Sequence, residues 1–208
     1  MEVLRVRDET AEPGILARAA DVLRAGDLLI YPTDTLYALG GRALDARAGR
    51  KVRAAKARES KPLPLIAADL EQVGTIASAV SADALRLAER FWPGPLTLIL
   101  EAHRAVPDEV TAGTATVAVR VPGLPLARRL CELAGPLIST SANPAGGTPP
   151  VTCDEAVAGV GDAAALAIDA GPGRAVASTI VDLTGRPARL VRSGAVAWAD
   201  VLALLQAG

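Results

Sequence analysis

Short apolar runs alternate with amphipathic stretches along the chain, which indicates strands interleaved with helices. Apolar or alternating runs predict strands at residues 2–6, 28–31, 63–67, 96–100, 116–121, 137–138, 165–168, 178–183 and 189–192. Apolar stripes and capping residues predict helices at residues 10–25, 46–56, 81–91, 125–134, 152–160 and 198–205, and another after Asp69. The pattern predicts an α/β (α+β) fold with a mixed sheet flanked by helices.

The composition narrows the class of protein. The chain has 208 residues and is 50% apolar, so we expect a single domain over residues 1–208. Its formal net charge of -1 provides no general attraction to nucleic acid. The spacing of Cys131 and Cys153 is not that of metal ligands, and His103 is the one histidine of the sequence, so a zinc site or a Ser-His-Asp triad is not supported. With no signal peptide and no apolar run near the ~20 residues of a membrane span, we expect a cytoplasmic protein.

Polar residues directly follow four of the predicted strands. These strands end at residues 31, 121, 138 and 192, and each end carries or runs into Thr, Ser, Arg or Asn. Ligands of open sheets sit outside strand ends, so the four ends predict one cleft. Taken one at a time, each has an ordinary structural explanation, such as a turn that satisfies local amides or a surface arginine.

A cationic cluster follows the helix predicted at residues 46–56. Lys56, Arg58 and Lys61 lie within six residues. A solvated basic helix end is the alternative explanation, because cations there complement the helix dipole. We expect these charges to be exposed and to contribute little to folding. With the polar loop at residues 33–35, the cluster indicates a site for one small anion.

The polar residues of these segments are Lys, Arg, Ser, Thr and Asn, which suit phosphate and carboxylate groups. No nucleophile is paired with a base. The P-loop pattern and the Gly-x-Gly-x-x-Gly pattern after a strand are both missing from the sequence. An enzyme with these residues works by orienting reactants and stabilising charge, which fits phosphoryl or nucleotidyl transfer.

Six motifs resemble those of one known family, in the same order and over nearly the whole chain. They are Pro32-Thr33-Asp34-Thr35-Leu36-Tyr37, Lys56-Ala57-Arg58, Trp92-Pro93-Gly94-Pro95-Leu96-Thr97, Val119-Arg120-Val121-Pro122, Ser141-Ala142-Asn143 and Ser178-Thr179-Ile180-Val181-Asp182. The sequence thus resembles the YrdC family, the L-threonylcarbamoyladenylate synthases, in its short form without an extra C-terminal domain.

The resemblance implies a twisted mixed sheet with a concave, positively charged cleft. It also implies a nucleotidyltransferase that joins L-threonine, bicarbonate and ATP into threonylcarbamoyl-AMP and pyrophosphate, with magnesium accompanying the ATP. Other proteins then transfer the threonylcarbamoyl group to an adenosine of tRNA. By motif position, the residues implied for L-threonine or its carbamate are Thr35, Arg120, Ser139 and Ser178. Those implied for ATP are Arg58, Lys61, Thr116, Ser141 and Arg192, and those implied for catalysis are Lys56, Arg58, Ser141 and Asn143.

Three positions depart from the family pattern. Ala38, Glu59 and Ile66 stand where glycine, proline and histidine are usual, and a YciO-type branch shares the Tyr-Ala-Leu form. The Lys56-x-Arg58 and Ser141-x-Asn143 pairs favour the synthase branch. Further alternatives are a double-stranded-RNA-binding module of the same fold and a carbamoyl-transfer domain like those of hydrogenase-maturation proteins. Because the cations form short clusters, we expect only weak RNA binding that falls with salt.

Overall fold

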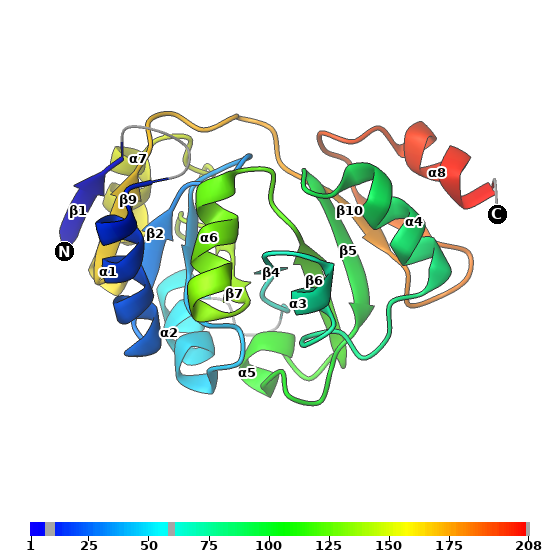
Figure 1. Cartoon of the computed structure of the whole chain (residues 1–208), viewed down its shortest axis with the longest axis horizontal. Helices are drawn as coiled ribbons and strands as arrows, with labels where there is room; N and C mark the ends of the chain where they lie inside the picture. Colours follow the sequence, from blue (N-terminus) through cyan, green and yellow to red (C-terminus); the bar gives the residue numbers. More distant parts are fainter. Residues whose placement is uncertain (7–10, 58–60, 207–208) are drawn as a thin grey trace.

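Two mixed sheets form the centre of the molecule, and helices cover their faces (Figure 1). The structure is a computed structural model, and it describes residues 1–6, 11–57 and 61–206. The five-stranded sheet has the strand order β1 (Glu2–Arg5), β9 (Leu166–Asp169), β2 (Leu29–Tyr31), β3 (Ala38–Gly40) and β8 (Thr140–Ser141). The six-stranded sheet has the order β11 (Arg189–Arg192), β10 (Thr179–Asp182), β5 (Leu96–Glu101), β6 (Thr116–Arg120), β4 (Leu65–Ile66) and β7 (Leu137–Ile138).

The predicted mixed α/β fold is confirmed, although its described strands divide into two sheets where we expected one. The helices are α1 (Pro13–Arg24), α2 (Ala46–Lys56), α3 (Leu70–Val73), α4 (Ala82–Phe91), α5 (Asp108–Thr111), α6 (Pro125–Ala134), α7 (Cys153–Val160) and α8 (Trp198–Gln206), with a 3-10 turn η1 (Gly161–Ala163) after α7. None of the described helices has the length and apolar character that crossing a membrane requires.

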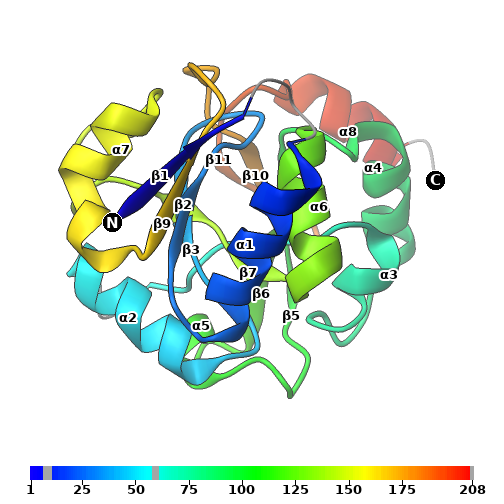
Figure 2. The same cartoon turned by 60° about the vertical axis from the view of Figure 1, so that its left-hand side comes forward.

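The central strand β2 explains why helices lie on both faces of the five-stranded sheet. Side chains alternate between the two faces of a strand. Leu28 and Ile30 pack into one apolar core with residues of α2 and α7, whereas Leu29 and Tyr31 pack into another with residues of α1 and α6. In Figure 2, α7 and α2 lie on one side of this sheet, and α1 and α6 lie next to each other on the opposite side. The short run 28–31 is therefore buried on both faces, as its apolar sequence predicts.

Capping residues set several helix boundaries as predicted. Asp45 accepts a hydrogen bond from the amide of Arg47 at 2.8 Å, and α2 follows it. Ser81 caps α4 through the amide of Ala84. Thr152 begins α7 with a capping box shared with Glu155. These local hydrogen bonds satisfy amides that the first helical turn leaves without partners.

Two predicted elements are much shorter in the structure. The helix expected at residues 10–25 begins at Pro13, because Glu12 is extended and Pro13 occupies the first turn; residue 10 itself lies outside the described residues. The strand expected at residues 63–67 is reduced to β4, since Pro64 has no amide hydrogen for a strand ladder.

Three predicted loops contain short elements. The loop at residues 103–113 includes α5, the loop after β2 includes β3, and the loop after β7 includes β8. β3 and β8 exist because β3 pairs antiparallel with both β2 and β8. Elements of two to four residues have too few positions to show a hydrophobic period in the sequence. The short strands β3 and β8 are instead determined by the strands with which they pair.

The two sheets are joined where the chain passes from β7 into β8. Ile138 belongs to the six-stranded sheet and Thr140 to the five-stranded sheet, so Ser139 is the crossing point. The amide of Ile138 donates to the oxygen of Gly41 at 2.8 Å, and the hydroxyl of Tyr31 donates to the oxygen of Ile138 at 3.0 Å. At Gly40 the strands are so close that a Cβ atom would lie 1.8 Å from the oxygen of Ile138.

We expect Gly40→Ala to lower the free energy of unfolding by about 1–3 kcal/mol, because the added methyl group forces the backbone of β3 away from β7. Gly14→Ala is the matched control: no atom lies within 4 Å of its Cβ position, and alanine favours the helix. Its free energy of unfolding should stay within about 1 kcal/mol of wild type, on the stabilising side. Urea unfolding of both variants measures the difference, and equal stability would contradict the close packing at the sheet junction.

Candidate functional site

A cavity of about 270 Å³ is lined by residues from both sheets. The five-stranded sheet contributes residues of β3 and β8, and the six-stranded sheet contributes residues of β4, β5, β6, β10 and β11. The structure brings together here six of the residues singled out in the sequence: Thr35, Arg120, Ser139, Ser141, Ser178 and Arg192. All but Ser178, which directly precedes β10, follow or end the four strands expected to meet in one cleft.

The polar loop after β2 is held by its own hydroxyl groups. The hydroxyl of Thr33 donates to the oxygen of Leu36 at 2.8 Å and accepts from the amides of Thr35 and Leu36. It also lies 2.9 Å from the hydroxyl of Thr35. This local turn presents Thr35 to the cavity with its side chain largely buried.

Arg120 is the most buried guanidinium of the cavity lining, with 7% of its side chain exposed. Its Nη1 donates to the Asp34 carboxylate, and its Nη2 donates to the Thr35 hydroxyl at 3.3 Å. A buried charge is tolerated when it is paired and hydrogen-bonded, and Asp34 provides that pairing. β6 and the loop after β2 are thereby connected across the cavity wall.

Arg192 lies at the end of β11 and is held by Ser178. Its Nε and Nη2 donate to the main-chain oxygen of Ser178 at 3.0 and 2.8 Å, and Nη2 also donates to the Ser178 hydroxyl at 3.0 Å. The Ser178 hydroxyl lies 2.8 Å from that of Thr97. Burial, and secondly the charge of Arg120, lower the pKa of Arg192, which nevertheless stays protonated at neutral pH. Its Nη1 donates to no acceptor among the described residues, so it is available to a ligand.

The charge of the cavity favours anions. Two guanidinium groups, those of Arg120 and Arg192, line it, and no carboxylate is among the lining residues that the structure describes. Asp34 compensates Arg120, whereas Arg192 is held only by neutral oxygens of Ser178. One positive charge therefore remains uncompensated next to several hydroxyl groups, an arrangement that suits phosphate or carboxylate.

Lys56 and Asn143 lie behind the cavity wall and are not among its lining residues. The ammonium group of Lys56 donates to the main-chain oxygens of Ser141, at 2.7 Å, and Asn143, and to Asn143 Oδ1 at 3.1 Å. Asn143 Nδ2 donates to the oxygens of Pro144 and Gly147 at 3.0 and 2.6 Å. The expectation of an exposed helix end is wrong for Lys56, which is only 4% exposed. Lys56 is buried because its ammonium group turns inward and donates to oxygens of residues 141 and 143.

Two other implied ATP residues, Lys61 and Thr116, lie outside the cavity lining. Lys61 is exposed next to Pro62, which lines the cavity. Thr116 begins β6 on the same face as the lining residues Ala118 and Arg120, and its hydroxyl lies 3.0 Å from that of Thr114. Arg58 lies outside the described residues, although α2 ends at Lys56 as predicted and Ala57 adopts a left-handed conformation.

Two residues that hold the site, Asp34 and Thr97, have no role predicted from the sequence. Asp34 holds Arg120, and Thr97 contacts Ser178 from β5. Both residues belong to motifs that resemble the family's, and this was the only sign in the sequence that they take part in the site. Their partners are 86 and 81 residues away in the chain, a separation that no local pattern reports.

The fold and the site define a class of mixed α/β proteins with a cation-lined cavity at the junction of two sheets. Comparison with known proteins places the chain within that class: it belongs to the Sua5/YciO/YrdC family, whose model, described as "Telomere recombination", matches residues 21–194. The family resemblance in the sequence is confirmed.

Two relatives are named threonylcarbamoyl-AMP synthase. The chain is 38% identical over 195 residues to the protein from Pyrococcus abyssi, covering 92% of this chain and 57% of the relative. It is 39% identical over 146 residues to the protein from Thiobacillus denitrificans, covering 69% of this chain and 76% of that relative. The chain therefore spans little more than half the length of the first relative.

Two solved structures share the fold. Sua5 from P. abyssi, complexed with L-threonine, superposes with a TM-score of 0.94 at 36% identity, over 99% of this chain and 61% of that chain. YciO from E. coli superposes with a TM-score of 0.86 at 27% identity, over 95% and 98% of the two chains. Both comparisons agree with the arrangement of sheets and helices described above.

We expect Lys56→Ala to lower the free energy of unfolding by about 2 kcal/mol or more, because buried oxygens of residues 141 and 143 lose their donor. Lys51→Ala is the control on the same helix: its ammonium group pairs with Asp27 at 2.5 Å, but its side chain is 36% exposed. Loss of such a surface pair costs less than about 1 kcal/mol. Chemical unfolding of the two variants measures the contrast, and equal losses would show that Lys56 is no more important to folding than a surface cation.

Proposed function

We propose that the chain is a threonylcarbamoyl-AMP synthase, which joins L-threonine, bicarbonate and ATP into threonylcarbamoyl-AMP and pyrophosphate. The observation that carries the proposal is the cavity at the sheet junction, where Arg120 and Arg192 meet several hydroxyl groups and no described lining carboxylate. The names of the two relatives and the L-threonine complex of the P. abyssi structure support the same reaction.

L-threonine and its carbamate occupy the part of the cavity around Arg120. The guanidinium binds a carboxylate. The hydroxyls of Thr35, Ser139 and Ser178 accept hydrogen bonds from the ammonium group of the substrate and exchange hydrogen bonds with its hydroxyl group. Asp34 holds the Arg120 guanidinium in place, so little orientational freedom is lost on binding. The apolar lining, including Ile66 and Ala118, contacts the substrate methyl group.

ATP occupies the part of the cavity around Arg192 and Ser141. Nη1 of Arg192 is directed to a phosphate oxygen, while its other nitrogens hold Ser178. Lys61 and Thr116 extend this region beyond the cavity lining, and Arg58 completes the cation cluster. Together, the positive charges of Arg192, Lys61 and Arg58 neutralise part of the triphosphate charge.

The chemical step is a nucleotidyl transfer. The amine of L-threonine and bicarbonate form a carbamate with loss of water. A carbamate oxygen then forms a bond to the α-phosphorus of ATP, and the bond from that phosphorus to the oxygen of the leaving pyrophosphate breaks. Negative charge increases on the leaving group, so a preorganised guanidinium such as that of Arg192 stabilises the transition state more than the ground state, and Arg58 contributes a second positive charge.

Lys56 and Asn143 act as positioning residues in this proposal. Neither lines the cavity, but the ammonium group of Lys56 fixes the main chain at Ser141 and Asn143. Asn143 in turn fixes the turn at residues 144–147. The Ser141 hydroxyl is thereby held at the cavity wall before the substrate arrives.

Magnesium fits the site as a partner of ATP. No cluster of three or more His, Cys, Asp or Glu residues exists in the described part of the chain, so the phosphates and water supply most of its oxygen ligands. When bound, magnesium neutralises charge on the triphosphate. Further partners in the proposal are the tRNA threonylcarbamoyl-transferase proteins that use the product, in the cytoplasm, with only weak direct binding of RNA.

We expect pyrophosphate release from ATP to require both L-threonine and bicarbonate, because the attacking oxygen exists only after the two have combined. The measurement is a coupled pyrophosphate assay in which each substrate is omitted in turn. Release that persists unchanged without L-threonine would exclude the synthase and favour a YciO-type protein without this activity.

We expect Arg192→Lys to lower turnover by about a hundredfold, since lysine cannot hold Ser178 and a phosphate oxygen at the same time. Arg189→Lys on the same strand is the matched control, because Arg189 pairs with Asp182 at 2.7 Å and does not line the cavity. Steady-state pyrophosphate release is compared for the two variants. Wild-type turnover in Arg192→Lys would remove this arginine from the ATP site.

A further inference from the structure

A second cavity, of about 370 Å³, adjoins the ion pair between Asp34 and Arg120. Arg120 lines the first cavity, whereas Asp34 lines the second and not the first. With side chains that are 7% and 14% exposed, the two residues form a wall that both cavities share. Apart from Asp34, which holds Arg120, the second cavity contains none of the residues to which the proposed synthase reaction assigns a role.

The two carboxylate oxygens of Asp34 have different surroundings. Oδ1 accepts the hydrogen bond from Arg120, and Oδ2 accepts none from the described residues. Oδ2 faces Gly123, where a Cβ atom would lie only 3.1 Å from it. Because residue 123 is glycine, Oδ2 stays open to the second cavity.

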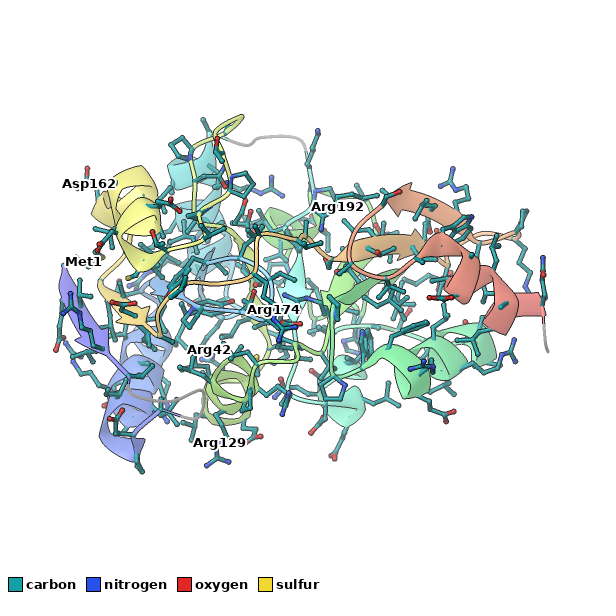
Figure 3. All side chains as sticks on the ribbon, turned by 90° about the horizontal axis from the view of Figure 1, so that it is seen from above. Met1, Arg42, Arg129, Asp162, Arg174 and Arg192 are labelled. Atoms are coloured by element: carbon teal, nitrogen blue, oxygen red, sulfur yellow. The ribbon has the colours of Figure 1, made fainter. Side chains whose placement is uncertain are left out.

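Arg174 supplies a positive charge to the same cavity. It ends the segment 170–174, which Tyr37 holds by donating to the oxygen of Gly171 at 2.6 Å and accepting from the amide of Ala170 at 3.1 Å. The guanidinium of Arg174 makes no hydrogen bond or ion pair with the described part of the chain. Figure 3 shows Arg174 near the middle of the molecule in the view from above.

The rest of the lining carries no charge. It consists largely of proline rings, the side chain of Leu124 and glycine backbone. The amides of Gly94, Ala170 and Gly173 are already hydrogen-bonded to Val121, Tyr37 and Val151. One carboxylate oxygen and one guanidinium therefore remain as the charged groups that a ligand would meet.

We propose that the second cavity binds a small zwitterion, a free α-amino acid. Its ammonium group donates to Oδ2 of Asp34, and its carboxylate accepts from Arg174. Charge-assisted hydrogen bonds of this kind are among the strongest in proteins, and the proline and leucine surfaces cover the apolar part of the ligand. A purely anionic ligand would approach the Asp34 carboxylate, and a purely cationic one would approach Arg174, so the pair of charges selects a molecule that carries both.

The test is calorimetric titration of L-threonine into the wild-type chain and into Arg174→Gln, without ATP. We expect two molecules of L-threonine per wild-type chain and one per chain of the variant. Arg104→Gln is the control, an exposed arginine outside both cavities, and should retain two. Melting curves of the variants establish that all are folded. The same stoichiometry in wild type and Arg174→Gln would overturn the proposal.

Two analogues test the need for both charges. L-threonine methyl ester lacks the carboxylate, and 3-hydroxybutyrate lacks the ammonium group. Each should bind the second cavity at least about tenfold more weakly than L-threonine, the effect of losing one charge-assisted hydrogen bond. Analogue binding as tight as that of L-threonine would overturn the assignment of a zwitterion.

Failure of the proposed synthase reaction gives a different result. If the first cavity does not bind L-threonine, the wild-type chain should bind one molecule, and Arg174→Gln should abolish that binding. If only the second-cavity proposal fails, one molecule should bind equally to both proteins, and pyrophosphate release should still depend on L-threonine.

Discussion

The close contact between Gly40 and the oxygen of Ile138 determines the geometry on which the site depends. It permits β3 and β7 to approach until the hydroxyl of Tyr31 reaches Ile138, and it places Ser139 between the two sheets. Residues on either side of Ser139 then extend one sheet each. The candidate site is therefore built at a junction, where side chains from both sheets face one cavity without a long loop to hold them.

Electrostatics at this junction depends on how each arginine is held. Arg120 is paired with the carboxylate of Asp34, which offsets the cost of burying the guanidinium but neutralises its charge in part. Arg192 is held by the main-chain oxygen and hydroxyl of Ser178, which orient the guanidinium without neutralising it. Arg192 therefore keeps its attraction for anions while remaining fixed, the combination expected of a group that stabilises developing negative charge.

The elements that the sequence predicts correctly are those specified by neighbouring residues. The period of α6, the capping of α2 by Asp45 and the apolar run of β2 are all visible in neighbouring residues. The sequence did not predict β3 and β8, which form through pairing of β3 with both β2 and β8. Nor did it predict that Lys56 turns inward to residues 141–143.

The same distinction applies to the site. Strand ends rich in Thr, Ser and Arg predicted that Thr35, Arg120, Ser139 and Arg192 meet in one cleft, and the structure brings them together. The partners that hold these residues, Asp34 for Arg120 and Ser178 for Arg192, are set by contacts between distant segments. These contacts determine that the charge of Arg192 stays uncompensated in the cavity, and the spacing of residues along the sequence could not predict them.

The most direct measurement of the central claim follows carbon from bicarbonate into a nucleotide. Radiolabelled bicarbonate is incubated with the chain, ATP and L-threonine, and the nucleotides are separated and analysed by mass spectrometry. A cavity that binds both substrates predicts label in an adduct of AMP that contains threonine, and no such adduct when L-threonine is omitted. ATP turnover to AMP or ADP with all label left in bicarbonate would contradict the account.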